Sequence, residues 1–103
     1  AFFGLVITDG TLSIRVLESV AEFADEGAAM HHCVFANTYY LKKDALILSA
    51  TIDGKRMETV EVSLQTFEVV QSRGINNSLT EHHDRIVSLV QDNMHLIRDR
   101  MAA

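Results

Sequence analysis

The chain has 103 residues, of which 48% are hydrophobic, enough for one domain with its own apolar core and too few for two ordinary domains. Its 9 basic and 14 acidic residues give a net charge of −5, which argues against nonspecific binding to duplex DNA. No apolar run approaches the ~20 residues that span a bilayer, so we expect a single domain over residues 1–103 that does not enter a membrane. The single cysteine, Cys33, excludes an intrachain disulfide and indicates a cytoplasmic protein.

An Asp-Gly pair in the N-terminal region predicts a β-hairpin. Glycine tolerates the positive φ of tight hairpin turns, so Asp9-Gly10 marks the turn. Apolar residues alternate on both sides of it, as in strands with one buried face: Phe3, Leu5 and Ile7 before the turn, and Leu12, Ile14 and Val16 after it.

A helix is predicted to begin at Ser19, because Ser19-Val20-Ala21-Glu22 has the form of a capping box. An apolar stripe at helical spacing would face the core. It comprises Val20, Phe23, Ala24, Gly27, Met30, His31 and Val34.

Three strand-like segments follow, over residues 45–52, 56–64 and 66–73. A three-residue loop at Asp53-Gly54 is predicted, because it unites the apolar residues of the first two segments on one face. A two-residue turn at Gln65-Thr66 would add Phe67 and Val69 to that face. This register places Arg73 opposite Glu58 and Gln71 opposite Val60, so the apolar face should end in a polar cluster.

One long helix is predicted for the C-terminal region, with Ser78-Leu79-Thr80-Glu81 as a capping box and Thr80 as a competing cap. His82 and His83 flank its apolar stripe, and His95 lies on the opposite side. The stripe comprises Leu79, Ile86, Val90, Met94, Ile97 and Met101. We therefore expect an α+β fold: an antiparallel sheet made of the N-terminal hairpin and a three-stranded meander, with one central and one long C-terminal helix on one face.

Two adjacent histidine pairs, His31-His32 and His82-His83, are the first candidates for chemistry. An imidazole on an apolar face must be hydrogen-bonded or coordinated, and a core histidine bonded to the backbone or to Glu58 meets this need. Alternatively, the pairs could join Cys33 in a zinc site, or His82 or His83 could activate Cys33 as a nucleophile, with Gln71 or Asn76 orienting the imidazole. The spacing lacks two short ligand pairs, so we predict neither a metal nor another cofactor.

Two further groups of residues could form a binding site or could be ordinary parts of the fold. Arg73-Gly74 with Asn76-Asn77 could bind an anion through the guanidinium fork and loop amides, or Arg73 could pair with Glu58 beside an ordinary turn. Tyr39-Tyr40 and Lys42-Lys43 could contact a nucleic-acid strand by stacking and charge, or form a helix end or loop.

Short motifs follow one another over nearly the whole chain. They are Glu26-Gly27-Ala28-Ala29-Met30-His31-His32-Cys33-Val34, Tyr40, Leu46-Ile47-Leu48-Ser49, Gly54-Lys55-Arg56-Met57-Glu58-Thr59-Val60-Glu61 and Gln71-Ser72-Arg73-Gly74-Ile75-Asn76-Asn77. In these motifs and their order the sequence resembles the PcfJ-like family, whose members occur on bacterial plasmids, conjugative elements and phages. The resemblance implies motif positions at His32, Cys33, Glu58, Gln71, Arg73 and Asn76 or Asn77, but no activity. Because family sequences generally extend further upstream and this chain opens on Ala1, we expect it to be part of a longer protein.

Three functional hypotheses remain open, and the first is favoured. Under the first hypothesis, the chain is a binding or interaction module of a mobile-element protein, whose partners are other mobile-element or conjugation proteins. Alternatively, it is a metal- or thiol-dependent enzyme that uses the His-Cys and Gln-x-Arg-Gly-x-x-Asn motifs, or the motif residues form a purely structural core network. The candidate pocket comprises His31, His32, Cys33, Glu58, Gln71, Arg73, Asn76, Asn77, His82 and His83.

Overall fold

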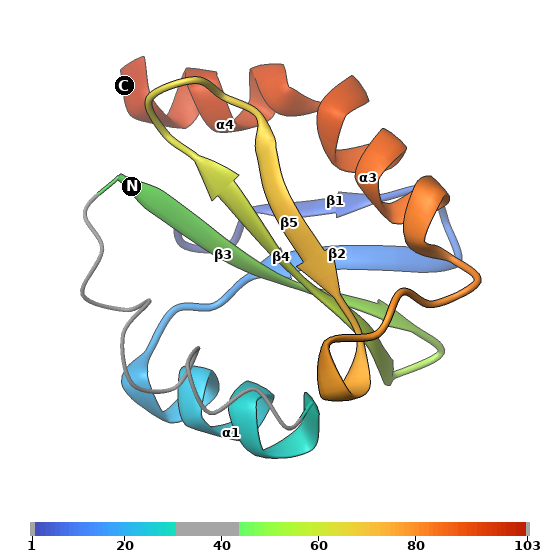
Figure 1. The fold of residues 1–103 in the computed structure, drawn as a ribbon. Coiled ribbons are helices and arrows are strands. Elements are labelled where there is room, and N and C mark those ends of the chain that lie inside the picture. Colours follow the sequence, from blue (N-terminus) through green and yellow to red (C-terminus); the bar gives the residue numbers. More distant parts are fainter. Residues whose placement is uncertain (1, 31–43, 103) are drawn as a thin grey trace.

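The computed structural model describes residues 2–30 and 44–102, which form one antiparallel sheet with helices packed against it (Figure 1). Each strand is hydrogen-bonded to the next along the chain, in the order β1-β2-β3-β4-β5. The elements are β1 (Val6–Thr8), β2 (Leu12–Val16), α1 (Val20–Met30), β3 (Ala45–Ile52), β4 (Lys55–Ser63), β5 (Val69–Arg73), the short 3-10 helix η2 (Ile75–Asn77), α3 (His83–Asp92) and α4 (Met94–Ala102). The α+β class, the N-terminal hairpin and the meander are confirmed.

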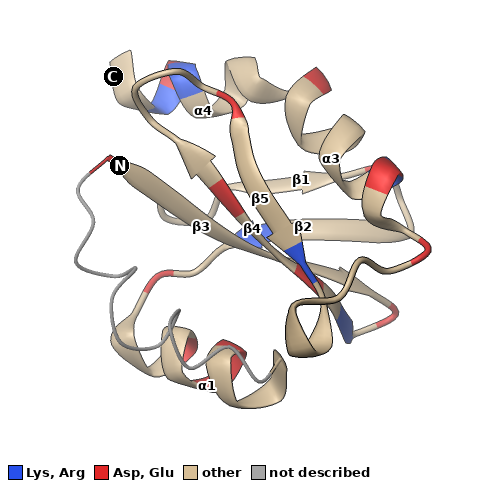
Figure 2. Cartoon of the chain, in the orientation of Figure 1, with Lys and Arg blue, Asp and Glu red and all other residues tan. Residues whose placement is uncertain are grey.

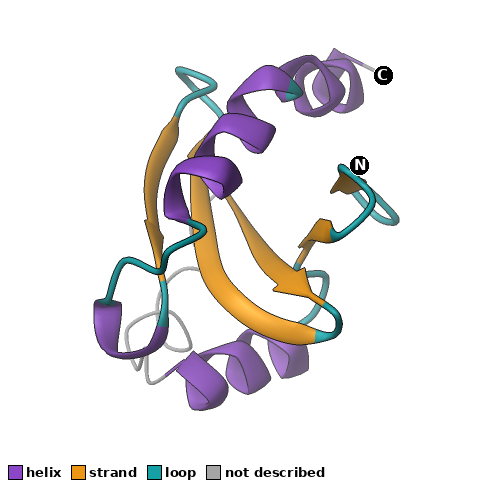
Figure 3. Cartoon of the chain, turned by 90° about the vertical axis from the view of Figure 1, so that its right-hand side faces the viewer, coloured by secondary structure: helices purple, strands orange, loops and turns teal. Residues whose placement is uncertain are grey.

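The helices lie on opposite faces of the sheet, which corrects the expectation that they share one face. α1 covers one face, and α3 and α4 cover the other, so the sheet is the middle layer (Figure 3). Successive side chains of a strand point to opposite faces, and both faces of β3 and β4 are buried: Leu48 and Val60 on one, Ile47 and Thr59 on the other. Because neither face can be left to solvent, both are covered by helices.

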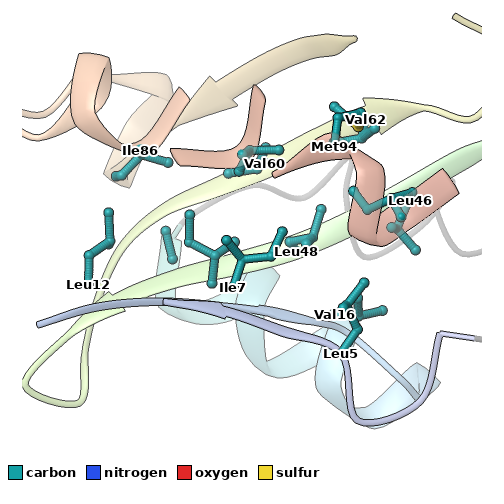
Figure 4. Close-up of a cluster of buried hydrophobic side chains, with 14 residues drawn as sticks. Leu5, Ile7, Leu12, Val16, Leu46, Leu48, Val60, Val62, Ile86 and Met94 are labelled. Atoms are coloured by element: carbon teal, nitrogen blue, oxygen red, sulfur yellow. The ribbon is translucent and has the colours of Figure 1, made fainter. Parts of the chain in front are cut away.

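The main hydrophobic core lies between the sheet and helices α3 and α4 (Figure 4). The helices contribute Ile86, Val90, Met94 and Ile97, so the central part of the predicted C-terminal stripe is confirmed. The sheet contributes alternate residues of β1 to β4 and one that precedes β1: Leu5, Ile7, Leu12, Ile14, Val16, Leu46, Leu48, Ala50, Val60 and Val62. Burial of this apolar surface is the main force that holds the two layers together.

Several residues predicted to face the core are exposed instead. They lie at the ends of elements, in the segments between or before them, or on the solvent side of α1: Phe3, Val20, Ala24, Leu79 and Met101. In α1 the buried stripe includes Glu26 in addition to the predicted Gly27 and Met30. The helix start is confirmed, since the Ser19 hydroxyl accepts the Glu22 N–H at 3.1 Å.

The register of β3 and β4 is as predicted, but the loop that sets it is different. Leu46 pairs with Val62 and Leu48 with Val60. The turn is a two-residue turn with both central residues at positive φ, 52° at Asp53 and 78° at Gly54. The extra residue of the predicted three-residue loop is taken up by a bulge at Met57, which restores the apolar pairing.

The predicted register of β5 is wrong over the part that carries the motif residues. The Ser63 hydroxyl accepts the N–H groups of two following residues, and a loop from 64 to 68 replaces the two-residue turn. Val69 pairs with Val62, and a bulge at Val70 then shifts the pairing, so that Arg73 lies opposite Thr59. A one-residue shift exchanges the two faces of a strand. Gln71 and Arg73 therefore lie on the α1 face, and Arg73 is not the cross-strand neighbour of Glu58.

The C-terminal helix is divided at Asn93 and begins later than predicted. The side-chain amide of Asn93 donates to the Leu89 carbonyl at 2.8 Å, which separates α3 from α4. α3 begins at His83 instead of at the predicted capping box. The Thr80 hydroxyl accepts a hydrogen bond from the backbone N–H of His82, the residue just before the helix. Within the described ranges, no helix combines the length and apolar character needed to cross a membrane.

Candidate functional site

The predicted pocket residues that the structure describes occupy separate places. Glu58 and His83 meet on the α3 side of the sheet, whereas Gln71 and Arg73 lie on the α1 side. The remaining described candidates are Asn76 and Asn77, exposed in η2, and His82, which lies 3.5 Å from the Glu81 carboxylate. Outside the described residues lie His31, His32 and Cys33, and also Tyr39, Tyr40, Lys42 and Lys43.

Glu58 is fully buried and has hydrogen bonds to three segments of the chain. Its Oε1 accepts from the Ser72 hydroxyl at 2.6 Å and lies 2.8 Å from His83 Nδ1, while its Oε2 accepts from the N–H and the hydroxyl of Thr80 at 2.9 and 2.8 Å. A carboxylate offers about four acceptor sites, so these four contacts saturate it. Glu58 thereby ties β4 to β5 and to the start of α3.

The hydrogen bonds around Glu58 also determine its charge. Burial acts to raise the pKa of the Glu58 carboxyl, but the hydrogen bonds from Ser72, Thr80 and His83 outweigh this and hold the pKa below its ordinary value. The carboxylate is ionised at neutral pH and can only accept hydrogen bonds, so the Nδ1 atom of His83 must carry the proton. The ionised form is the one that this pocket stabilises.

A second buried carboxylate, Glu26, lies on the opposite face of the sheet. It extends from α1 and accepts from the Ser49 hydroxyl at 2.8 Å, the Thr59 hydroxyl at 2.5 Å and Arg56 Nε at 2.9 Å. Glu26 is only 1% exposed. Because three donors and one positive charge compensate the buried charge, α1 is fixed to β3 and β4 by polar contacts as well as by packing.

A cleft of about 290 Å³ opens beside the Glu26 contacts on the α1 face of the sheet. The strands bring its polar residues into adjacent positions: Arg15 pairs with Ser49 in the β2–β3 ladder, and Ser13 pairs with Thr51. The lining residues are Val6, Ser13, Arg15, Ser49, Thr51, Gly54 and Arg56. Two guanidinium groups and three hydroxyls therefore surround one cleft.

Each cleft arginine is bound to one carboxylate of α1. Arg15 Nη1 lies 2.7 Å from Glu22, and Arg56 Nε lies 2.9 Å from Glu26. The arginine side chains remain 49% and 39% exposed. Among the described residues, the Nη groups of Arg56 make no hydrogen bond, so this cation has donors left for a ligand. Acidic positions lie along α1 and a basic position lies on β2 (Figure 2).

Sequence reasoning missed the cleft and the Glu26 contacts. One signal was present: Glu26 is three residues after Phe23 and four before Met30, so it falls on the buried stripe of the helix. A carboxylate on such a stripe requires donors from the opposing layer. Ser49 and Thr59, on the face of β3 and β4 opposite the apolar one, are such donors.

The chemistry open to the cleft is binding of an anion. The two accessible guanidinium groups donate hydrogen bonds to carboxylate or phosphate oxygens, and so can the hydroxyls of Ser13 and Thr51, whereas the single hydroxyl proton of Ser49 is donated to Glu26. In residues 2–30 and 44–102, no three His, Cys, Asp or Glu side chains gather closely enough to hold a metal ion.

Comparison with known proteins identifies the family. The family model described as PcfJ-like protein matches residues 1–87, which include the buried Glu26 and Glu58 and every residue that lines the cleft. Neither the curated proteins nor the solved structures gave a match. The match spans well over half of the sequence and agrees with the motifs described above, and the chain therefore belongs to the PcfJ-like protein family.

Proposed function

We propose that this domain is a binding module of a mobile-element protein and that the cleft on its α1 face holds an anionic group of the partner. The observation that supports this most is the meeting of Arg15, Arg56 and the hydroxyls of Ser13 and Thr51 around one cleft of about 290 Å³. This volume is at the lower end of the range for ligand pockets and suits a carboxylate or phosphate group on a larger partner.

The polarity of the α1 face supports a binding role. Ser49 and Thr59 bind Glu26 beneath α1, whereas Ser13, Arg15 and Thr51 lie on the part of the same face that α1 leaves open. Polar side chains at such positions do not contribute the hydrophobic stabilisation that apolar ones would. A binding surface explains their presence better than packing does.

The motif residues fit this proposal in two ways. We propose that Gln71 and Arg73, on the same face of the sheet as the cleft, extend the binding surface toward β5. Glu58 and His83 take a structural role, which is supported by the four hydrogen bonds that saturate the buried Glu58 carboxylate.

Calorimetric titration with inorganic phosphate and with acetate tests the proposed site. Arg15→Gln removes one cleft cation, and Lys55→Gln is the matched control, because Lys55 is exposed on the neighbouring β3–β4 hairpin and does not line the cleft. We expect saturable binding that Arg15→Gln weakens at least about fivefold and Lys55→Gln less than about twofold. No saturable binding by the unaltered domain, or equal losses in the two variants, would overturn the proposal.

A further inference from the structure

The two ion pairs between α1 and the cleft arginines differ in how firmly they are held. Glu22 and Glu26 are one turn apart on α1, and each binds one cleft arginine. Glu26 is 1% exposed and has two hydroxyl partners besides Arg56. Glu22 is 28% exposed and binds Arg15, itself 49% exposed. Solvent therefore competes for the Glu22 contact far more than for the Glu26 contact.

We infer that Glu22 is an intramolecular competitor, which occupies Arg15 in the free domain and is displaced when an anionic ligand enters the cleft. This inference rests on the proposed function. It follows from the contact itself: Arg15 Nη1 donates to Glu22 Oε2 at 2.7 Å, and an anion that binds across the two terminal nitrogens of this guanidinium needs the same donor. Glu26 stays in place on binding, because its removal from Arg56 would leave a buried charge without its cation.

Release of Glu22 leaves α1 intact. The first turn is held by the Ser19 hydroxyl, which accepts the backbone N–H of Glu22, and not by the Glu22 carboxylate. A carboxylate in the first turn remains favourable toward the helix dipole when its side chain moves into solvent. The exchange therefore requires a change of side-chain conformation and no unfolding.

The strength of this competition is bounded by the exposure of the pair. Ion pairs as open as this one change an equilibrium by about fivefold at most. Glu22 thus raises the ligand concentration needed for half-saturation by a small factor. Since every anion that binds Arg15 through Nη1 must displace the same carboxylate, the factor is the same for all of them.

Glu22→Gln tests the inference, with Asp25→Asn as the matched control. Asp25 lies on the same helix and is exposed, and within the described part of the chain it has no hydrogen bond or ion pair. Both substitutions remove one negative charge from α1. We expect Glu22→Gln to tighten the Kd for inorganic phosphate and for acetate by the same factor, about two- to fivefold, and Asp25→Asn to change either Kd by less than about 1.5-fold.

The outcomes separate this inference from the proposed function. Glu22 acts by general repulsion if Glu22→Gln has no more effect on the Kd than Asp25→Asn, or if it tightens phosphate binding much more than acetate binding. Either result overturns the inference and leaves the proposed anion site in the cleft unaffected. If binding depends on Arg15 and both ligands gain equally, the competitor role holds. If neither the unaltered domain nor Glu22→Gln binds either anion, the proposed function itself fails. Equal melting temperatures of the two variants exclude an effect through folding.

Discussion

Glu58→Gln is expected to destabilise the domain severely, because it removes the charge from a buried and saturated acceptor. A glutamine can direct its amide nitrogen toward Ser72 and His83, whose hydroxyl and ring can accept, and keep its oxygen for the two Thr80 donors. Each of the four contacts then loses its charge assistance, about 1 kcal/mol apiece. Burying a neutral amide costs less than burying a carboxylate, so we expect a net loss of roughly 2–3 kcal/mol.

Urea denaturation at pH 7 measures this loss, with Glu81→Gln as the control. Glu81 is exposed, so its substitution should change the free energy of unfolding by less than about 0.5 kcal/mol. In thermal unfolding, the Glu58 variant should melt roughly 8–20 °C below the unaltered domain. A Glu58→Gln domain as stable as the Glu81→Gln domain would refute the structural role of the Glu58 contacts.

The pH dependence gives an independent check of the same contacts. The pKa of Glu58 is held below its ordinary value of 4.5, so its contribution to stability is complete above that pH and is lost as the pH falls through the folded-state pKa. Glutamine has no such transition. The stability difference between the unaltered domain and Glu58→Gln should therefore shrink in acid below about pH 4.5. A difference that stays constant to the lowest accessible pH would contradict this account.

Two further predictions concern other polar contacts. Thr59→Ala should lower the free energy of unfolding by roughly 1–3 kcal/mol, because it removes a buried hydroxyl that donates to Glu26. The control Thr66→Ala, in the exposed loop before β5, should lower it by less than about 0.5 kcal/mol. Equal losses in chemical denaturation would contradict the Glu26 contacts. Asp9 has its pKa lowered to about 2, first by the N–H of Leu12 and then by Arg85, so its contribution is present above pH 3.8 and is lost as the pH falls toward 2. Asp9→Asn should therefore flatten the acid unfolding profile in this window, and an unchanged profile would argue against the contact between the hairpin turn and α3.

The part of the fold that could be predicted is the part in which apolar spacing decides the outcome. Side-chain parity alone is enough to pair Leu48 with Val60, because a shift by one residue would bury charged residues on that face. The helix positions Ile86 and Val90 were predictable for the same reason. In both places many apolar contacts favour one arrangement, and local details such as the bulge at Met57 adapt to it.

The register of β5 could not be predicted, because hydrogen bonds in a loop determine it. The Ser63 hydroxyl closes a longer turn than the apolar pattern suggested, and the bulge at Val70 adds one residue to the strand. That single residue moves Gln71 and Arg73 from one face of the sheet to the other. Strand parity carries no information about such an insertion.

The candidate site was harder to predict than the fold, because its residues look ordinary in the sequence. Arg15 and Arg56 each lie in a strand of mixed polarity, where a charged residue usually faces solvent. Glu26 falls on the buried stripe of its helix, but its partners are known only from the structure, in which Ser49 and Thr59 oppose it. The expectation that both helices lie on one face of the sheet assigned no helix to the polar face, so it did not predict the contacts between α1 and that face.

The location of anion binding tests the central claim most directly. A ¹⁵N–¹H NMR titration of the domain with inorganic phosphate reports which backbone amides respond. We predict that the largest saturable shifts occur at the cleft strands, at Ser13, Arg15, Ser49 and Thr51, with small changes at Ser72 and Thr80 beside Glu58. Saturable shifts centred on the Glu58 side of the sheet, with the cleft amides unchanged, would contradict the account.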